Sequence, residues 1–220
     1  MTLTKFGIDV LVAVAIIAIV LIGLAIWADE IWLRIVLVLV ASFIVLFSLN
    51  FFRDPDRTPA TNGRSLDTLA ISPADGKVVI LQDVVEAEYL KGPAKMISIF
   101  MNPLDVHVNR SPMTGVVDYF RYVKGEFLVA SLPEASHRNE RAIIGLNANG
   151  KHIMFSQIAG YVARRIVCPV KVGDTLEAGK RFGMIKFGSR VDIFLPPNAH
   201  ILIKMGDIVK AGETVLAELP

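Results

Sequence analysis

The sequence contains very little cysteine and almost no net charge. Cys168 is the single cysteine in 220 residues, which excludes an intramolecular disulfide and any all-cysteine metal site. In the apolar run IVCPV this side chain is expected to pack as a small apolar group. The 23 basic and 21 acidic residues leave a net charge of +2, without a long basic run or a basic patch interleaved with aromatic residues. Nucleic acid is therefore excluded as a partner.

The histidines do not share the spacing of metal ligands, and neither HExxH nor a Cys-His cluster occurs, so no metal site is predicted. His137 lies in the polar stretch EASHRNER and is expected in a loop, either solvated or in contact with substrate. His152 follows a turn signal, and His200 begins an expected strand. His107 lies in a different setting, which is described below.

Long hydrophobic runs are abundant, in contrast, and they lie at the N-terminus. Residues 10–27 and 35–52 are uncharged, and each run approaches the roughly 20 apolar residues that cross about 30 Å of hydrocarbon. We predict a transmembrane hairpin in residues 1–54, with helices over about 8–27 and 32–52. A signal peptide fits poorly because no small-x-small cleavage site follows the first run. A buried helical pair in a soluble protein is the other alternative.

Charges around the hairpin predict its orientation. Lys5 precedes the first run, Arg53 and Arg57 follow the second, and the connection carries Asp29 and Glu30. The positive-inside rule then places both ends on the cytoplasmic side of the cell (inner) membrane. The domain that follows is expected on that face.

The remainder of the chain is predicted to be one mainly β domain over residues 68–220, joined to the hairpin by a linker over residues 55–67. The linker is rich in Pro, Asp, Arg and Thr. Beyond it, β-branched runs alternate with Gly, Pro, Asn and Asp, as in strands and turns. The expected strands lie within residues 77–85, 95–101, 115–123, 141–146 and 152–162.

An internal repeat indicates the architecture of this domain. VGDTLEAGKRFGMI (172–185) matches MGDIVKAGETVLAE (205–218) at a period of 33 residues, with the shared skeleton Gly-Asp-x-apolar-x-Ala-Gly. Such turns recur in barrel-sandwich folds, including lipoyl and biotinyl carrier domains. We therefore expect two halves of a quasi-symmetric sandwich. Lys186 would be the modified lysine of a carrier domain, although the sequence after it reads as a buried strand.

Three short motifs contain residues suited to chemistry. In NPLDVHVNRSP, Asp105, His107 and Asn109 alternate with valines, which predicts a strand with one polar face. Asp75 in SPADG has a simpler explanation as a hairpin turn. The Gly188-Ser189 pair in KFGSR is explained equally well as an ordinary turn.

Taken in order, these motifs carry a family resemblance. FFRDP, SPADG, NPLDVHVNRSP, the triplet Asn139-Glu140-Arg141 and KFGSRVDIF occur in the order found in phosphatidylserine decarboxylases. The sequence resembles most the short, membrane-anchored form, to which archaetidylserine decarboxylases are related. The resemblance covers the chain from about residue 50 onward.

The resemblance implies a zymogen that makes its own pyruvoyl cofactor by autocatalytic cleavage between Gly188 and Ser189. The products are a large chain, residues 1–188, and a small chain, residues 189–220. Phosphatidylserine from the bilayer then forms a Schiff base with the pyruvoyl group and leaves as phosphatidylethanolamine. By the same resemblance, His107 and Asp75 handle protons, and His107 is expected to return the proton after decarboxylation.

One departure from the family pattern leaves residue roles open. Longer members carry a second histidine three positions after the first, where this sequence has Arg110. Either His107 and Asp75 manage both reactions, or another group such as His137 replaces the missing histidine. Arg110 and Arg141 are further candidates for binding the lipid phosphate or the substrate carboxylate.

Two other classes remain as alternatives. A membrane-anchored barrel-sandwich adaptor would carry a long helical hairpin between its halves, for which the 33-residue spacing leaves no room. An inactive relative would keep Gly-Ser without cleaving it. The sequence leaves open whether the lipid is diacyl or an archaeal ether lipid, and whether the protein forms a homo-oligomer.

Overall fold

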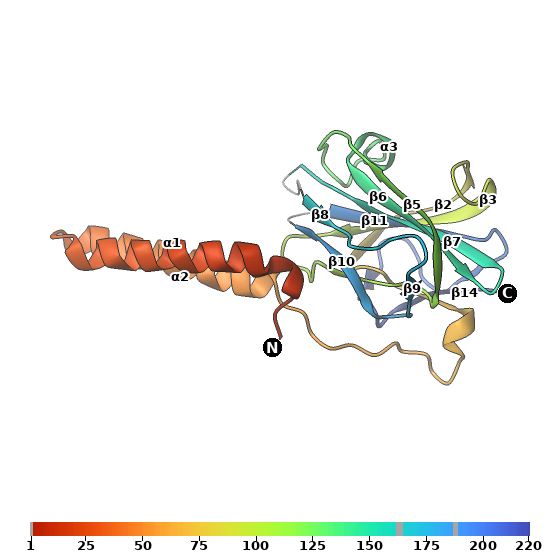
Figure 1. Ribbon diagram of the computed structural model, residues 1–220, viewed down its shortest axis with the longest axis horizontal. Helices are drawn as coiled ribbons and strands as arrows, with labels where there is room; N and C mark the ends of the chain where they lie inside the picture. Colours follow the sequence, from red (N-terminus) through yellow and green to blue (C-terminus); the bar gives the residue numbers. More distant parts are fainter. Residues whose placement is uncertain (1, 162–164, 187–188) are drawn as a thin grey trace. The chain divides into compact units, whose positions relative to one another are not determined.

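The computed structural model, shown in Figure 1, describes residues 2–161, 165–186 and 189–220. The chain divides into a helical unit, residues 1–56, and a β unit, residues 57–220. The two units are described separately below.

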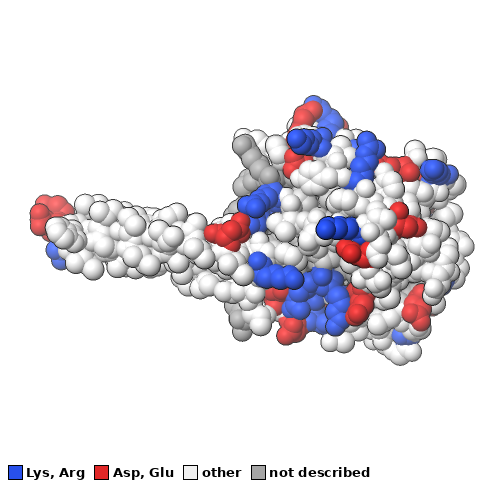
Figure 2. Space-filling view, in the orientation of Figure 1, with Lys and Arg blue, Asp and Glu red and all other residues white. Residues whose placement is uncertain are grey.

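Two antiparallel helices, α1 (Ile8–Trp27) and α2 (Ile31–Phe51), form the first unit. Both are long and apolar enough to cross a membrane, and their bounds lie within one residue of those predicted. Only 11% of each apolar window is buried, whereas the helices of a soluble core are mostly covered. The face of the hairpin seen in Figure 2 is free of charged side chains between its two ends. The unit has the surface expected of a membrane-spanning pair.

The second unit is built mainly of antiparallel strands, as predicted. Its largest sheet has eight strands in the order β13-β2-β3-β11-β7-β6-β5-β9. Their bounds are β13 (Ile208–Val209), β2 (Gly76–Glu86), β3 (Gly92–Met101), β11 (Ser189–Leu195), β7 (Lys151–Ile158), β6 (Arg141–Ala148), β5 (Gly115–Val123) and β9 (Thr175–Leu176). Each of the five strand segments predicted from the sequence overlaps a strand of this sheet; the last, residues 152–162, was predicted too long, because β7 ends at Ile158, and Val162 lies outside the described residues.

Two smaller sheets complete the β unit. One contains β1 (Leu69–Ile71), β14 (Val215–Glu218) and β12 (His200–Ile201), and the other contains β4 (Val108–Arg110), β10 (Arg181–Lys186) and β8 (Arg165–Val167). The short helix α3 (Ala135–Arg138) lies in the connection between β5 and β6. The three sheets share one core, to which β11 contributes Val191, Ile193 and Leu195.

The strand order has an internal symmetry. Read from either end, the eight-stranded sheet presents a short strand, a long hairpin and a central strand, so that β13-β2-β3-β11 mirrors β9-β5-β6-β7. The two small sheets correspond in the same way. One half therefore combines β1–β3 with β11–β14, and the other combines β4–β6 with β7–β10.

Matching backbone contacts extend the repeat that the sequence predicted. Gly206 N–H donates to the carbonyl of Val78 at 2.9 Å, and Gly173 N–H donates to that of Val117 at 2.8 Å. The glycines of the two Ala-Gly turns, Gly179 and Gly212, have φ values of +74° and +73°. The predicted quasi-symmetric halves are confirmed, and the symmetry also includes the strands before the repeat.

The residues preceding β4 differ from the prediction. The strand begins at Val108, whereas Asp105 lies in a turn, where its carboxylate accepts the N–H of Asn102 at 2.7 Å. Val106, His107 and Asn109 are all buried. The expected strand is therefore wrong for residues 105–107 and correct from Val108 onward, and its polar side is as buried as its apolar side.

The start of β2 depends on Gly76. Its φ of +147° is available to glycine, and a Cβ there would overlap the carbonyl oxygen of Phe100. We expect Gly76→Ala to lower the free energy of unfolding by roughly 3 kcal/mol or more, because a clash adds to the backbone strain. Gly63→Ala is the control, since Gly63 has φ +82° with open space around it. Equal shifts of the thermal midpoint in circular dichroism would contradict the role of the close approach.

Candidate active site

Ser189 is the first residue of β11, the strand that pairs with β3 on one side and β7 on the other. It lies opposite Met101 and is fully buried. The hydroxyl donates to the sulfur of Met101 at 3.3 Å. Gly188, the other half of the predicted cleavage site, lies outside the described residues. The predicted nucleophile is thus at the beginning of a central strand, in a buried setting.

A chain of polar side chains continues from Ser189 into the core. The amide of Asn109 donates to the Met101 sulfur at 3.7 Å and to the Pro73 carbonyl at 3.4 Å. Gln157 on β7 in turn donates to the Asn109 side-chain oxygen at 2.8 Å. Sequence reasoning noticed Asn109 for its alternation with His107, but it missed Met101 and Gln157. Both appear in the sequence as ordinary strand residues, so only the strand pairing reveals them.

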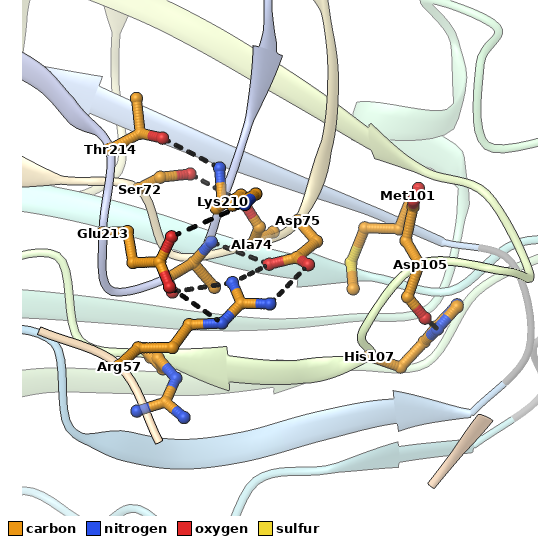
Figure 3. A network of polar contacts seen from close by, with 12 residues as sticks. Arg57, Ser72, Ala74, Asp75, Met101, Asp105, His107, Lys210, Glu213 and Thr214 are labelled. Carbon is orange, nitrogen blue, oxygen red and sulfur yellow. Dashed lines mark hydrogen bonds and ion pairs between the residues drawn. The ribbon is translucent and has the colours of Figure 1, made fainter. Parts of the chain in front are cut away.

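His107 is fully buried between the 102–105 turn and β4. Its Nδ1 lies 3.0 Å from the carbonyl oxygen of Asp105 (Figure 3). A carbonyl oxygen only accepts, so Nδ1 carries the proton and Nε2 is the basic nitrogen of the neutral ring. The His107 carbonyl accepts the N–H of Ile185 at 3.4 Å. That bond ties His107 to β10, the strand that precedes residue 188.

Asp75 is buried and belongs to a charged network, so a plain exposed turn does not describe it. Its two carboxylate oxygens accept hydrogen bonds from Nη1 and Nη2 of Arg57, and Oδ1 also accepts the N–H of Ala211 at 2.8 Å. Arg57 further lies 3.6 Å from Glu213. The sequence analysis placed Arg57 in a linker and did not predict its pairing with Asp75. An arginine that will be paired in the fold has the same appearance in a sequence as any polar linker residue.

The internal symmetry shows what is special about Asp75. SPADG (72–76) corresponds to SPMTG (111–115), and the hydroxyls of Ser72 and Ser111 each donate to a carbonyl two residues ahead at 2.7 Å. In the second copy Thr114 accepts the N–H of Ala178 at 3.0 Å, as Asp75 accepts that of Ala211. Capping the turn therefore requires only an oxygen. The charge of Asp75 is an addition found in one half.

The structure places the candidate substrate-binding residues Arg110, Arg141 and His137 in two different settings. Arg110 is buried, and its Nη1 donates to the Gly179 carbonyl at 3.0 Å beside Gly212, so it packs between the two repeat turns. Arg141 donates to the carbonyl of His137 at 2.7 Å, and both residues line a pocket of about 210 Å³. This pocket also contains Asp192, which points to the face of β11 opposite to Ser189.

Other reactive groups are unsuited to the chemistry considered. Lys186 is buried at the end of β10, whereas a carrier lysine must be exposed. Burial raises the pKa of the Cys168 thiol to about 11, so the thiolate is scarce at neutral pH. Among the described residues, no group of three His, Cys, Asp or Glu side chains is placed to hold a metal ion.

The mainly β unit thus presents a buried serine at the start of a central strand and a buried histidine whose ring is oriented by a backbone carbonyl. The sequence model of the phosphatidylserine decarboxylase family matches residues 44–217. The chain belongs to this family. It is similar to phosphatidylserine decarboxylase proenzymes of Salinibacter ruber (46% identity, 90% of this chain and 87% of the relative), Solidesulfovibrio magneticus (52%, 79% and 79%) and Chlorobium limicola (41%, 98% and 99%). Family membership excludes the adaptor alternative.

We expect Arg57→Met to destabilise the protein by about 3–5 kcal/mol, because it leaves the buried Asp75 carboxylate without its guanidinium. Lys95→Met is the control: Lys95 pairs with Asp83 at 3.4 Å on the surface, and such pairs contribute about 0–1 kcal/mol. Thermal unfolding of the full chain in detergent measures both. Similar midpoints for the two variants would show that the Arg57–Asp75 pair does not stabilise the fold.

Proposed function

We propose that the protein decarboxylates phosphatidylserine to phosphatidylethanolamine in phospholipid biosynthesis, with a pyruvoyl group formed from Ser189. The observation that carries this proposal is the position of Ser189, buried at the start of a central strand and directly after Gly188. The names of the relatives, phosphatidylserine decarboxylase proenzymes, support the same reaction and a processed chain.

In the proposed self-cleavage, the Ser189 hydroxyl attacks the Gly188 carbonyl and the peptide bond becomes an ester. Loss of the Ser189 α-proton forms the Cα=Cβ double bond and breaks the Cβ–Oγ bond of the ester, which leaves a carboxylate on Gly188 and a dehydroalanine at position 189. Water then replaces the nitrogen, and ammonia leaves. The sum is one chain plus water giving two chains and ammonia, with the serine oxygen retained by Gly188.

The residues around Ser189 fit this chemistry. A serine hydroxyl is a weak nucleophile unless a base accepts its proton. We assign that role to Nε2 of His107, whose backbone carbonyl accepts the N–H of Ile185 on β10, the strand that leads to Ser189. The Met101 sulfur is only a weak acceptor, so it holds the hydroxyl without competing strongly for its proton. We assign Asp75 to proton handling through its buried negative charge.

In the decarboxylation step the pyruvoyl group supplies an electron-withdrawing carbonyl with which the substrate amine condenses. The protein has to exclude water and return a proton to the substrate carbon. We assign that proton transfer to His107, whose ring is fixed through Nδ1. General acid–base catalysis of this kind contributes about 10²–10⁴-fold. Arg141 and His137 remain proposed contacts for anionic groups of the lipid, whereas the packing of Arg110 favours a structural role.

We further propose that α1 and α2 cross the cell membrane and hold the catalytic unit, residues 68–220, on its cytoplasmic face. The exposed apolar surfaces of both helices support the crossing, and Lys5 and Arg53 at the two ends of the hairpin support the orientation. Arg57, which the sequence counted with them, is paired with Asp75 in the β unit. A tethered enzyme meets a bilayer lipid without extracting it into water. The large chain, residues 1–188, and the small chain, residues 189–220, remain joined by the strand pairs of β11.

The variant Ser189→Ala tests the proposed self-cleavage, because it removes the attacking hydroxyl. Intact mass spectrometry should show wild type as two chains, with the small chain lighter than residues 189–220 by the mass of one ammonia molecule. The Ser189→Ala variant should remain a single chain. The control is Ser98→Ala, which removes another buried serine hydroxyl from the neighbouring strand β3. A wild-type protein that stays whole would instead indicate an inactive relative.

A double variant separates the charge of Asp75 from its capping role. In the double variant Asp75→Thr/Arg57→Met, the threonine caps the turn as Thr114 does, and no buried charge is left unpaired. We expect melting close to that of wild type, with self-cleavage slowed about 10²-fold or more because the negative charge is lost. The time course of small-chain appearance measures the rate. Cleavage at the wild-type rate would reduce Asp75 to a structural cap.

A further inference from the structure

The two halves of the β unit differ most in one connection. Residues 87–91 join β2 to β3, whereas residues 124–140 join the corresponding strands β5 and β6 and include α3. Asn139, which is fully buried, holds the base of this longer segment: its side chain bonds both backbone groups of Leu128 and the carbonyl of Ala159. The extra residues are therefore fastened to the sheet.

The same segment is held at its centre by Arg190, the residue directly after Ser189. The Arg190 side chain is fully buried, and its Nη1 donates to the carbonyls of Ala130 at 3.0 Å and Leu132 at 2.9 Å. Nη2 donates to the Ser136 hydroxyl. Three contacts thus run from one side chain of β11 to the segment 130–136.

The charge of Arg190 is balanced by Asp192 on the same face of β11. Nε of Arg190 lies 2.9 Å from Oδ1 of Asp192 as an ion pair, although the angle is not that of a good hydrogen bond. Nη2 lies 3.2 Å from Oδ2, which also accepts the Ser136 hydroxyl at 2.8 Å. Buried charges persist where they are paired in this way.

We propose that Arg190, with Asp192 and Ser136, is an inter-chain clamp that positions the reactive end of the small chain after cleavage. This inference rests on the proposed cleavage at Gly188-Ser189, which puts Arg190 and Asp192 on the small chain and residues 130–136 on the large chain. Arg190 is a positioning residue: it touches neither the hydroxyl of Ser189 nor the face on which that hydroxyl lies. It acts through the backbone that the two residues share.

The clamp matters more after the cut than before it. In the uncut chain, position 189 is held on both sides, by the peptide bond to residue 188 and by β11. Cleavage removes the first restraint, and the new terminus then depends on the strand pairs and the Arg190 contacts. A displacement of about 1 Å in a reacting group can cost about 10²-fold in rate. Loss of the clamp should therefore reduce turnover more than cleavage.

The test is the double variant Arg190→Met/Asp192→Leu in the full-length protein, which removes both charges together and so avoids an unpaired buried ion. The matched control is Arg138→Met/Glu126→Leu, which removes an exposed ion pair of 2.8 Å from the same segment. Intact mass spectrometry gives the extent of cleavage. Turnover of phosphatidylserine in mixed micelles gives kcat and KM. The rate is divided by the concentration of pyruvoyl groups, which is measured by titration with a hydrazine reagent.

We expect the clamp variant to cleave fully and to show a kcat at least about tenfold lower, with KM within about threefold of wild type. Arg190→Lys should recover part of kcat, since lysine retains the charge but not the planar fork. A folded clamp variant with kcat within twofold of wild type, or one that stays uncut, would overturn the clamp. If wild type itself yields no two chains, the proposed function fails first, so the two failures are distinguishable.

Discussion

The pairing of β11 with β3 and β7 is the constraint on which the candidate site depends. Ser189 begins this strand opposite Met101 of β3, and the pairing with β7 begins at the next residue, Arg190. Any reactive group made at position 189 is therefore attached to a strand that is held on both sides. A strand at the edge of the sheet would have only one neighbour, and a cut at its end would free the terminus to fray. A central strand can lose the peptide bond before it and still present residue 189 in the same place.

The internal symmetry separates what builds the fold from what builds the site. The turns at Gly179 and Gly212 and the serines of the two SPxxG motifs recur in both halves, so they are explained by folding alone. The departures are Asp75 in place of Thr114, the longer connection 124–140 and Ser189 itself. A pseudo-symmetric scaffold needs none of these, and their restriction to one copy each is the physical reason to associate them with function.

Much of the fold could be predicted from the sequence because the signals for its helices, strands and turns are local. The apolar runs predicted both helices, and β-branched runs separated by turn residues predicted the strands. The 33-residue repeat predicted two similar halves. The SPxxG correspondence escaped notice because only three of its five letters agree. Arg57, Met101 and Gln157 escaped because their roles depend on residues 18, 88 and 48 positions away in the chain. The 105–109 segment was misjudged since alternation alone does not reveal a second covered face.

Burial of Ser189 also bears on which product the proposed cleavage would give. An ester between residues 188 and 189 has two fates: attack by water restores a serine at the new terminus, whereas loss of the α-proton leads to the pyruvoyl group. Water is needed only afterwards, for the release of ammonia. A fully buried serine beside a thioether and an amide slows the first fate more than the second, because water has to reach the ester from outside the site whereas a proton can move within it. The later release of ammonia follows the break between residues 188 and 189, after which the ester no longer exists. For the proposed cleavage, the burial of Ser189 thus favours formation of the pyruvoyl group over simple hydrolysis.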